Sequence, residues 1–260
     1  MFFQTNGVNI FYQCAGEGKP ILLLHGWGGC GDSFKPVFNA LSASARVYAI
    51  DFPGHGQSDI PQTPWSVGDF AEATRAFMQA MDIVGCDVIA HSFGGRVVIK
   101  LAGTDPGLFS KIVLTGAAGI RPRRGAKYYV KVYSYKLFKR MAKHAWMCKL
   151  CKCVGLDVQK RTQNAGSADY RALPESMRRT FSLVVNEDLK KYLRHIQNPT
   201  LLIWGADDQD APLWMGQIME KEIRDSGLVV YENAGHFAYL ERLPNFVAVV
   251  SHFLLSEETA

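Results

Sequence analysis

The sequence predicts an α/β protein in which helices flank a mostly parallel sheet and a helical cap is inserted into the chain. Short apolar runs rich in β-branched residues alternate with stretches whose apolar residues recur at helical spacing. This alternation stops after residue 119 and resumes at residue 194. Because strands that alternate with helices form parallel sheets with right-handed crossovers, we expect residues 1–119 and 194–260 to form one core. Residues 120–193 contain no clear buried strand, so we expect them to form the cap.

The first half of the core begins with an expected hairpin. Asn6-Gly7 separates two runs of strand composition, and Asn-Gly is strongly favoured in two-residue hairpin turns. Short apolar runs and helical stretches then alternate as far as the cap. The expected strands are 2–5, 8–12, 21–24, 47–50, 87–90 and 111–115, and the expected helices are one through Leu41 capped by Asp32 or Ser33, one over 66–81 and one from Phe93.

The same alternation returns after the expected cap and continues nearly to the end of the chain. The expected strands are 199–204 and 228–231, and the expected helices are 213–223 and 243–254. No internal repeat interrupts the pattern, which favours a single α/β core.

The composition fits a globular protein with a substantial core. Of the 260 residues, 48% are hydrophobic and 12% are aromatic. Residues 1–7 lack a basic region followed by an apolar run, and no apolar run is long enough to cross a bilayer. Six cysteines at irregular spacing are typical of reduced thiols. We therefore expect a cytoplasmic protein without a signal peptide or a membrane span.

The net charge of +5 is unevenly distributed along the chain. Residues 121–161 contain 13 Lys and Arg against one acid, whereas the rest contains 16 basic and 23 acidic residues. Apolar residues in this segment recur at helical spacing opposite Lys131, Lys139 and Lys143. The pattern fits a cap helix with a solvated basic face; attraction of anionic substrates and contact with an acidic membrane surface stay open. No nucleic-acid recognition motif accompanies the charge, so no such partner is expected.

Four candidate metal ligands lie in the same basic segment. They are His144, Cys148, Cys151 and Cys153, and on a helix the first three would share a face. Zinc sites usually combine two separated pairs of ligands, and this run lacks that arrangement. We therefore expect reduced thiols here and predict neither a metal nor a cofactor.

Ser92 lies where an apolar strand passes into a helix, and the nearby residues Ala90, Gly94 and Gly95 are small. A serine in so tight a turn is held in a strained conformation that costs about 1–3 kcal/mol. In return, its hydroxyl is exposed at the carboxyl end of the strand, and the helix N-terminus behind it favours negative charge. The pattern predicts a nucleophilic serine.

A serine hydroxyl becomes a good nucleophile when a base takes its proton and an acid orients that base. His236 follows the last expected strand, where a loop can bring its imidazole to the carboxyl edge of the sheet. The loop after the preceding strand contains three acids, Asp207, Asp208 and Asp210. Position alone leaves all three acids as candidates.

Five stretches, in this order along the chain, resemble motifs of the α/β-hydrolase-fold serine hydrolases. They are 25–28 (His-Gly-Trp-Gly), 51–58 (Asp-Phe-Pro-Gly-His-Gly-Gln-Ser), 90–94 (Ala-His-Ser-Phe-Gly), 205–212 and 235–236. Ala90 stands where the family usually has glycine, a difference of one methyl group. The resemblance extends over nearly the whole chain except the cap, and it implies an α/β-hydrolase fold.

The resemblance also implies roles for single residues. Ser92 would be the nucleophile and His236 the base, and Asp208 has the family's spacing for the acid. The main-chain N–H groups of Trp27 and Phe93 would form the oxyanion hole, and both residues would contact the substrate.

Three further histidines lie in or beside these motifs. His25, His55 and His91 are expected to serve the structure, as hydrogen-bonding groups that hold the loops. No acid follows the expected strand 111–115, so the alternative position that some relatives use for the triad acid is empty.

The implied function is hydrolysis of a small-molecule ester, thioester or lactone by a Ser-His-Asp triad through an acyl-enzyme. A carbon–carbon hydrolase of the meta-cleavage type is an alternative, although such relatives usually carry Asn where this chain has His91. An acyltransferase or perhydrolase would use the same triad with another acceptor. A non-catalytic ligand-binding or scaffold protein on the same fold is the alternative from another class.

Overall fold

The computed structural model describes residues 1–121, 130, 133–134, 136–137, 140 and 173–256. The chain divides into two compact units, one formed by Met1–Arg121 with Arg179–Ala260 and the other by Pro122–Arg178. Most of the second unit falls outside the described residues, so the expected cap over 120–193 stays a prediction. The fold described below is that of the larger unit.

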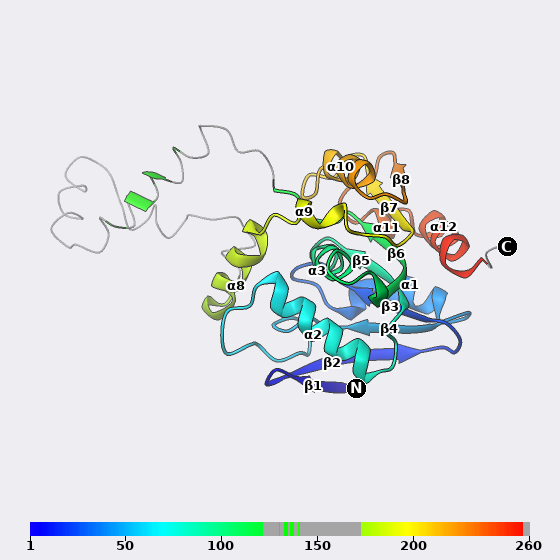
Figure 1. The fold of residues 1–260 in the computed structure, drawn as a ribbon, viewed down its shortest axis with the longest axis horizontal. Helices are drawn as coiled ribbons and strands as arrows, with labels where there is room; N and C mark the ends of the chain where they lie inside the picture. Colours follow the sequence, from blue (N-terminus) through cyan, green and yellow to red (C-terminus); the bar gives the residue numbers. More distant parts are fainter. Residues whose placement is uncertain (122–129, 131–132, 135, 138–139, 141–172, 257–260) are drawn as a thin grey trace. The chain divides into compact units, whose positions relative to one another are not determined.

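An eight-stranded sheet lies at the centre of the larger unit (Figure 1). The β1–β2 and β2–β4 pairs are antiparallel and the remaining neighbours are parallel. This mostly parallel sheet confirms the predicted α/β fold. In spatial order the strands are β1 (Phe2–Thr5), β2 (Val8–Ala15), β4 (Arg46–Ile50), β3 (Pro20–Leu24), β5 (Cys86–His91), β6 (Phe109–Thr115), β7 (Thr200–Gly205) and β8 (Ser226–Tyr231).

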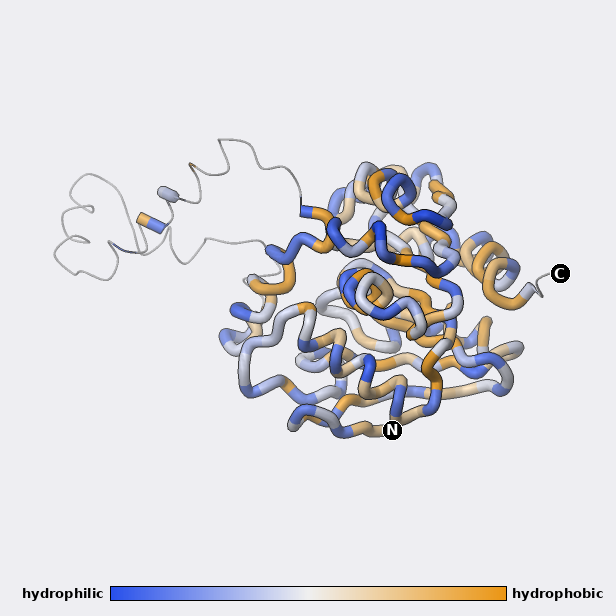
Figure 2. Tube along the Cα trace, viewed as in Figure 1, coloured by the Kyte–Doolittle hydropathy of each residue, from blue (hydrophilic) through white to orange (hydrophobic). Residues whose placement is uncertain are grey.

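Helices cover both faces of the sheet. One face is packed against α2 (Val67–Ala80), α3 (Phe93–Ala102), α9 (Lys190–Leu193) and α10 (Trp214–Glu222), and the other against α1 (Lys35–Leu41), α11 (Ala238–Glu241) and α12 (Leu243–Leu255). The strands and α3 are largely hydrophobic along their length (Figure 2). Since each large apolar side chain that is fully buried contributes about 1.5–3 kcal/mol, these two layers hold the sheet in place.

Local sequence explains where the first elements begin and turn. Asn6 and Gly7 have φ angles of 49° and 73°, which is the geometry of the expected hairpin turn. Helix α2 begins after Ser66, whose N–H and hydroxyl both donate to the carboxylate of Asp69. The Asp69 carboxylate thereby satisfies the Ser66 N–H, one of the groups that a helix N-terminus leaves free.

The start of α1 differs from the sequence-based expectation. Asp32 and Ser33 do not cap an α-helix directly, because they lie inside a 3-10 turn, Gly31–Phe34, that precedes Lys35. The Ser33 hydroxyl accepts from the N–H of Cys30, 3.2 Å away, and so caps that turn instead.

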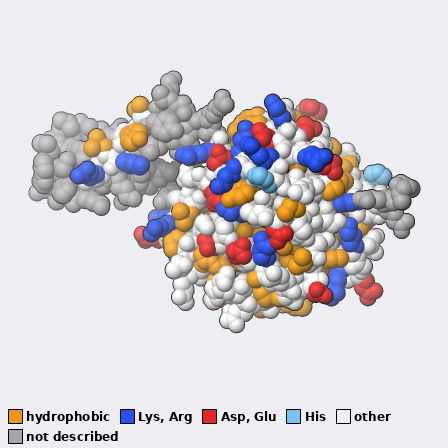
Figure 3. Space-filling view, in the orientation of Figure 1, with side chains coloured by type: hydrophobic (Ala, Val, Ile, Leu, Met, Phe, Trp, Pro, Cys, Tyr) orange, Lys and Arg blue, Asp and Glu red, His pale blue; other side chains and the backbone are white. Residues whose placement is uncertain are grey.

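Charged side chains are mixed on the face shown in Figure 3, and basic ones gather over α9. This helix carries Lys190 and Lys191, and Arg194 and His195 follow it directly. Lys190 is paired with Glu222 of α10 at 3.2 Å. Among the described residues, no helix has the length and apolar character needed to cross a membrane.

Candidate active site

Ser92 occupies a sharp turn between β5 and α3. Its φ and ψ angles are 49° and −105°, a strained region for a residue with a side chain. The two glycines that follow Phe93 are required because atoms of neighbouring segments approach their Cα atoms closely. A Cβ atom at Gly94 would collide with the carbonyl of Leu24, and one at Gly95 with the side chain of Ala117.

Main-chain hydrogen bonds fix this turn to the segments on either side. The N–H of Ser92 donates to the carbonyl of Thr115 at 3.2 Å, and its carbonyl accepts from the N–H of Ala118 at 3.0 Å. The N–H of Gly94 donates to the carbonyl of His25 at 3.1 Å. The turn is therefore held rigidly against the loops that follow β3 and β6.

Asp208 and His236 are hydrogen-bonded to each other at the same edge of the sheet. The distance from His236 Nδ1 to Asp208 Oδ2 is 2.8 Å, and the Asp208 side chain is fully buried. The other oxygen, Oδ1, accepts from the N–H groups of Asp210 and Ala211 at 2.9 and 2.8 Å. Because a carboxylate only accepts, Nδ1 carries the proton and leaves the Nε2 lone pair free.

The other two acids of this loop lie elsewhere. The side chains of Asp207 and Asp210 are exposed, and no hydrogen bond joins either carboxylate to His236 within the described chain. The structure therefore brings one of the three candidate acids to the histidine.

Gly116 connects the turn at Ser92 with this acid–histidine pair. It directly follows Thr115, and its φ is +50°. A Cβ atom at Gly116 would lie 3.2 Å from both Asp208 Oδ2 and His236 Nδ1. The sequence showed a glycine after this strand, but nothing local indicated that it contacts two loops about 90 and 120 residues further along.

The two residues expected to supply the oxyanion hole lie in different segments: Phe93 directly follows Ser92 at the start of α3, and Trp27 lies in the loop after β3. Within the part of the chain that the structure describes, neither N–H donates a hydrogen bond. Phe93 is the first residue of α3, where helix N–H groups have no partner in the helix. Each N–H is therefore available to donate a hydrogen bond to an acceptor oxygen of a ligand.

His25 holds the loop that carries Trp27. Its Nε2 accepts from the N–H of Phe52 at 2.9 Å, so Nδ1 carries the proton and donates to the carbonyl of Gly26 at 2.7 Å. Complete burial, with a smaller effect of His55, lowers the pKa of His25 to about 3. The ring is therefore neutral at physiological pH, as its two bonds require.

Asp51 also helps to hold this loop, through hydrogen bonds to main-chain N–H groups. Its carboxylate accepts from the N–H of Gly31 at 2.6 Å and from that of Gln57 at 2.8 Å. Its carbonyl accepts from the hydroxyl of Ser58 at 2.6 Å. The stretch 51–58 is thereby closed on itself and tied to the loop after β3.

His91 and His55 also have structural partners. His91 Nε2 lies 3.0 Å from the carbonyl oxygen of His236, and His55 Nδ1 lies 3.2 Å from that of Pro53. Burial, together with the nearby His236 ring, lowers the pKa of His91 to about 3, and burial also lowers that of His55. Each is a hydrogen-bonded neutral ring, in agreement with the expected structural role.

Aromatic rings surround this edge of the sheet. The Trp27 ring lies 5.2 Å from the rings of Phe93 and Phe181 and 4.7 Å from that of His55. Phe181 comes from α8 (Glu175–Asn186). The side chains close to Ser92 are thus largely apolar, which suits an apolar group of a ligand.

Comparison with known proteins gives the family. The model of the alpha/beta hydrolase family matches residues 21–249. The chain belongs to the alpha/beta hydrolase family.

Two relatives of this hydrolase span nearly its whole length. A pimeloyl-[acyl-carrier protein] methyl ester esterase of Nitrosospira multiformis is 25% identical over 264 residues, which is 95% of this chain and 98% of the relative. A 2-hydroxy-6-oxo-6-phenylhexa-2,4-dienoate hydrolase of Comamonas testosteroni is 25% identical over 265 residues, which is 94% of this chain and 91% of the relative.

A solved structure supports the fold of the hydrolase. An esterase from Exiguobacterium antarcticum superimposes with a TM-score of 0.75 at 24% identity, over 98% of this chain and 99% of the other. At this level of identity the likeness concerns the fold.

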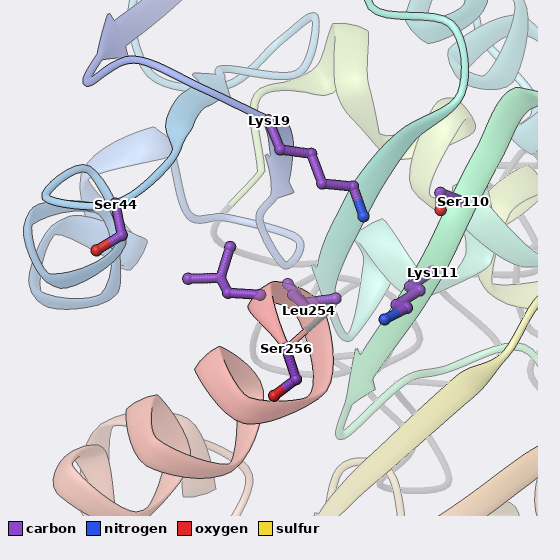
Figure 4. A pocket seen from close by; sticks show the side chains of 7 residues that line it. Lys19, Ser44, Ser110, Lys111, Leu254 and Ser256 are labelled. Carbon is purple, nitrogen blue, oxygen red and sulfur yellow. The ribbon is translucent and has the colours of Figure 1, made fainter. Parts of the chain in front are cut away.

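The hydrolase also has a hollow at the opposite edge of the sheet, near the amino ends of β3, β4 and β6 (Figure 4). Lys19 faces it and pairs with the buried Asp87 at 2.8 Å, while Lys111 Nζ donates to the carbonyl of Phe253 at 3.0 Å. Both ammonium groups are therefore already partnered. This hollow is separate from Ser92, which lies at the carboxyl edge.

No group of three or more metal-ligating side chains occurs among the residues that the structure describes. The candidate ligands His144, Cys148, Cys151 and Cys153 lie outside those residues, as does most of the basic segment 121–161. The described cysteines, Cys14, Cys30 and Cys86, carry free thiols.

Proposed function

We propose that this hydrolase is a serine hydrolase that cleaves a small-molecule carboxylic ester, thioester or lactone through an acyl-enzyme. The observation that carries the proposal is the 2.8 Å hydrogen bond from His236 to the buried Asp208, at the sheet edge where the strained Ser92 lies. A base with a free Nε2 lone pair, an orienting acid and a half-buried serine at one edge of the sheet are the parts that acyl transfer needs.

In the proposed reaction, His236 Nε2 takes the proton of the Ser92 hydroxyl while Oγ forms a bond to the carbonyl carbon of the substrate. The carbonyl oxygen becomes negatively charged and accepts hydrogen bonds from the N–H groups of Trp27 and Phe93. Each such donor, placed in advance, is worth about 3 kcal/mol in the transition state. The intermediate collapses when the imidazolium donates its proton to the leaving alcohol or thiol.

The acyl group then remains on Ser92 Oγ until water removes it. His236 takes a proton from that water, the oxygen adds to the acyl carbon, and the proton returns to Ser92 as the acid leaves. Asp208 keeps the same tautomer of His236 in both steps and stabilises its protonated form. The neutral rings of His25 and His91 hold the surrounding loops without competing for the proton.

Ser92→Ala tests this proposal. Wild-type protein should be labelled by a fluorophosphonate, with the added mass on the peptide that contains Ser92, and should hydrolyse p-nitrophenyl esters. The Ser92→Ala variant should keep its melting temperature and lose both the label and the activity. Labelling of the variant to the same extent would contradict the assignment of Ser92. Absence of labelling and activity in the wild type would favour a non-catalytic binding or scaffold role.

A carbon–carbon hydrolase is the second candidate, because one relative that matches nearly the whole chain is a 2-hydroxy-6-oxo-6-phenylhexa-2,4-dienoate hydrolase. Against it, His91 stands where the meta-cleavage hydrolases usually carry Asn. Turnover of a panel containing esters, thioesters, lactones and a vinylogous 1,5-diketone distinguishes the two reactions. Adding alcohols or peroxide to the ester assays and measuring the products tests the acyltransferase and perhydrolase alternatives.

A further inference from the structure

We propose that Arg96 and Lys100 are positioning residues that determine which acyl groups the site accepts. They extend from α3, the helix that begins after Ser92, and hold Glu187, the residue that directly follows α8. In doing so they fix Phe181 of α8 against Trp27. The inference rests on the proposed esterase function and adds a specificity determinant to it.

Both side chains reach the same residue. Arg96 Nη1 donates to the main-chain carbonyl of Glu187 at 2.9 Å, and Lys100 Nζ lies 2.7 Å from Glu187 Oε1. The bond from Arg96 is to the backbone, so it fixes the path of the chain rather than the direction of a side chain. Glu187 is thus held by its carbonyl and by its carboxylate from one helix.

Arg96 is unusual because its guanidinium is buried, with 8% of the residue exposed. Burial lowers its pKa to about 10, so the group is still charged at physiological pH. A buried charge is costly unless it is well partnered, and the acidic side chains of Glu187 and Asp188 offset part of that cost. An apolar side chain would fill the same space without this cost, so the contact with Glu187 explains why an arginine is found here.

Glu187, Asp188 and Leu189 form a short turn that is tied down at each residue; we call it the 187–189 turn. The N–H of Leu189 donates to the carbonyl of Gly119 at 2.8 Å. Asp188 Oδ1 accepts from the N–H of Arg121 at 3.5 Å. The turn therefore joins α3 to the segment that follows β6.

Helix α8, which precedes this turn, contacts Trp27 of the candidate active site and the apolar core beside it. The hydroxyl of Thr180 accepts from the N–H of Trp65 at 3.1 Å, and the Phe181 ring lies 5.2 Å from that of Trp27. Val184 is buried in the same apolar core as Phe93. Because α8 ends at Asn186, one residue before Glu187, a shift of the 187–189 turn is passed directly to Phe181.

Fold stability alone would be a sufficient role for Arg96, but it explains Lys100 poorly. The side chains of Lys100 and Glu187 are 23% and 25% exposed, so water reaches this ion pair in part and weakens its contribution to stability. A pair of this kind can still set the position of a loop. The two roles predict different results for substrates that differ in acyl size.

The test compares Lys100→Met and Arg96→Lys with Arg75→Met. Arg75 provides a matched control, because its side chain is 22% exposed and pairs with Asp105 at 2.6 Å, away from α8. For each protein we would measure kcat and KM for p-nitrophenyl acetate and p-nitrophenyl phenylacetate. The melting temperature reports any general loss of stability.

We expect Lys100→Met to raise KM for the phenylacetate ester about 3- to 10-fold more than KM for the acetate, with little change in the ratio of the kcat values. Arg96→Lys should act in the same direction more strongly, since the shorter-reaching ammonium cannot hold the carbonyl in the same way. Arg75→Met should leave the ratio of the two KM values as it is in the wild type. Equal changes for both esters in the Lys100 and Arg96 variants would overturn the inference.

Fluorophosphonate labelling of the wild type separates this failure from that of the proposed function. An unlabelled, inactive wild type would contradict the esterase proposal, and the specificity inference with it. A labelled wild type whose Lys100 and Arg96 variants keep the wild-type acyl preference would contradict the positioning role alone. If Arg96→Lys does not fold, the preference of Lys100→Met decides the question.

Discussion

His91 donates from Nε2 to the main-chain carbonyl of His236, which lies 3.0 Å away, and the two rings are 4.6 Å apart. The residue next to Ser92 therefore holds the loop that carries the proposed base. The bond requires a proton on Nε2, and burial keeps the ring neutral. This hydrogen bond joins two segments that are 145 residues apart in the sequence. Protonation of the buried His91 ring would therefore destabilise the folded state.

The free energy of unfolding should depend on pH because of His91. Burial lowers the pKa of His91 from 6.5 to about 3, so below pH 6.5 the unfolded chain binds more protons than the folded one. The free energy of unfolding should therefore fall as the pH falls from 6.5 toward 3, by about 1.4 kcal/mol per unit for this residue. Urea unfolding at about pH 7.5 and 5.5 should show a smaller loss in His91→Gln than in the wild type. His195→Gln, at an exposed histidine, is the control; equal losses in all three proteins would refute the assignment.

Asp208→Asn should lower kcat by about three to four orders of magnitude. An amide in place of the buried carboxylate no longer stabilises the protonated imidazole, and its NH₂ group favours the wrong tautomer of His236. Stopped-flow or steady-state hydrolysis of a p-nitrophenyl ester measures the effect. Asp207→Asn and Asp210→Asn change exposed side chains and should lower kcat less than about threefold. A severe loss in Asp210→Asn with a mild one in Asp208→Asn would reverse the assignment of the acid.

Gly116→Ala should lower kcat at least about tenfold while the protein stays folded. The added Cβ would lie 3.2 Å from Asp208 Oδ2 and His236 Nδ1, and the φ of +50° disfavours a side chain. Since displacements near 1 Å in an active site can cost about 100-fold, a small shift of the pair suffices. Gly227→Ala is the matched control, because a Cβ there meets nothing within 4 Å. Equal activity of the two variants would show that the pair tolerates the displacement.

The sequence predicted the parallel sheet well because each core strand is an apolar run with little ambiguity. Cys86–His91 and Phe109–Thr115 match the expected strands to within two residues at each end. The four-residue helix α11, Ala238–Glu241, was missed, since so short an element has no periodicity to detect. The spatial order of the strands depends on pairing across the chain, which local pattern does not contain.

For the candidate site, motifs indicated single residues but not their contacts. The stretch 205–212 offered three acids, and it is the burial of Asp208 and its bonds to two N–H groups that distinguish it. No sequence pattern indicated a role for Arg96, because its partner Glu187 is 91 residues away and accepts through a main-chain carbonyl. Contacts of this kind carry no local signal.

The basic segment 121–161 lies mostly outside the described residues, but its charge leads to a prediction about the salt dependence of activity. It holds 13 basic residues against one acid, in a chain whose remainder is acidic. If this charge attracts anionic substrates, kcat/KM for an anionic ester should fall as salt rises, because the Debye length shrinks from about 10 Å at 0.1 M to about 3 Å at 1 M. A neutral ester of similar size should change little. Replacing Lys131, Lys139 and Lys143 with Met together should reproduce the fall at low salt, mainly through KM. Parallel salt profiles for the two esters would reject this steering, and co-sedimentation with anionic vesicles would then test a membrane-contact role for the same lysines.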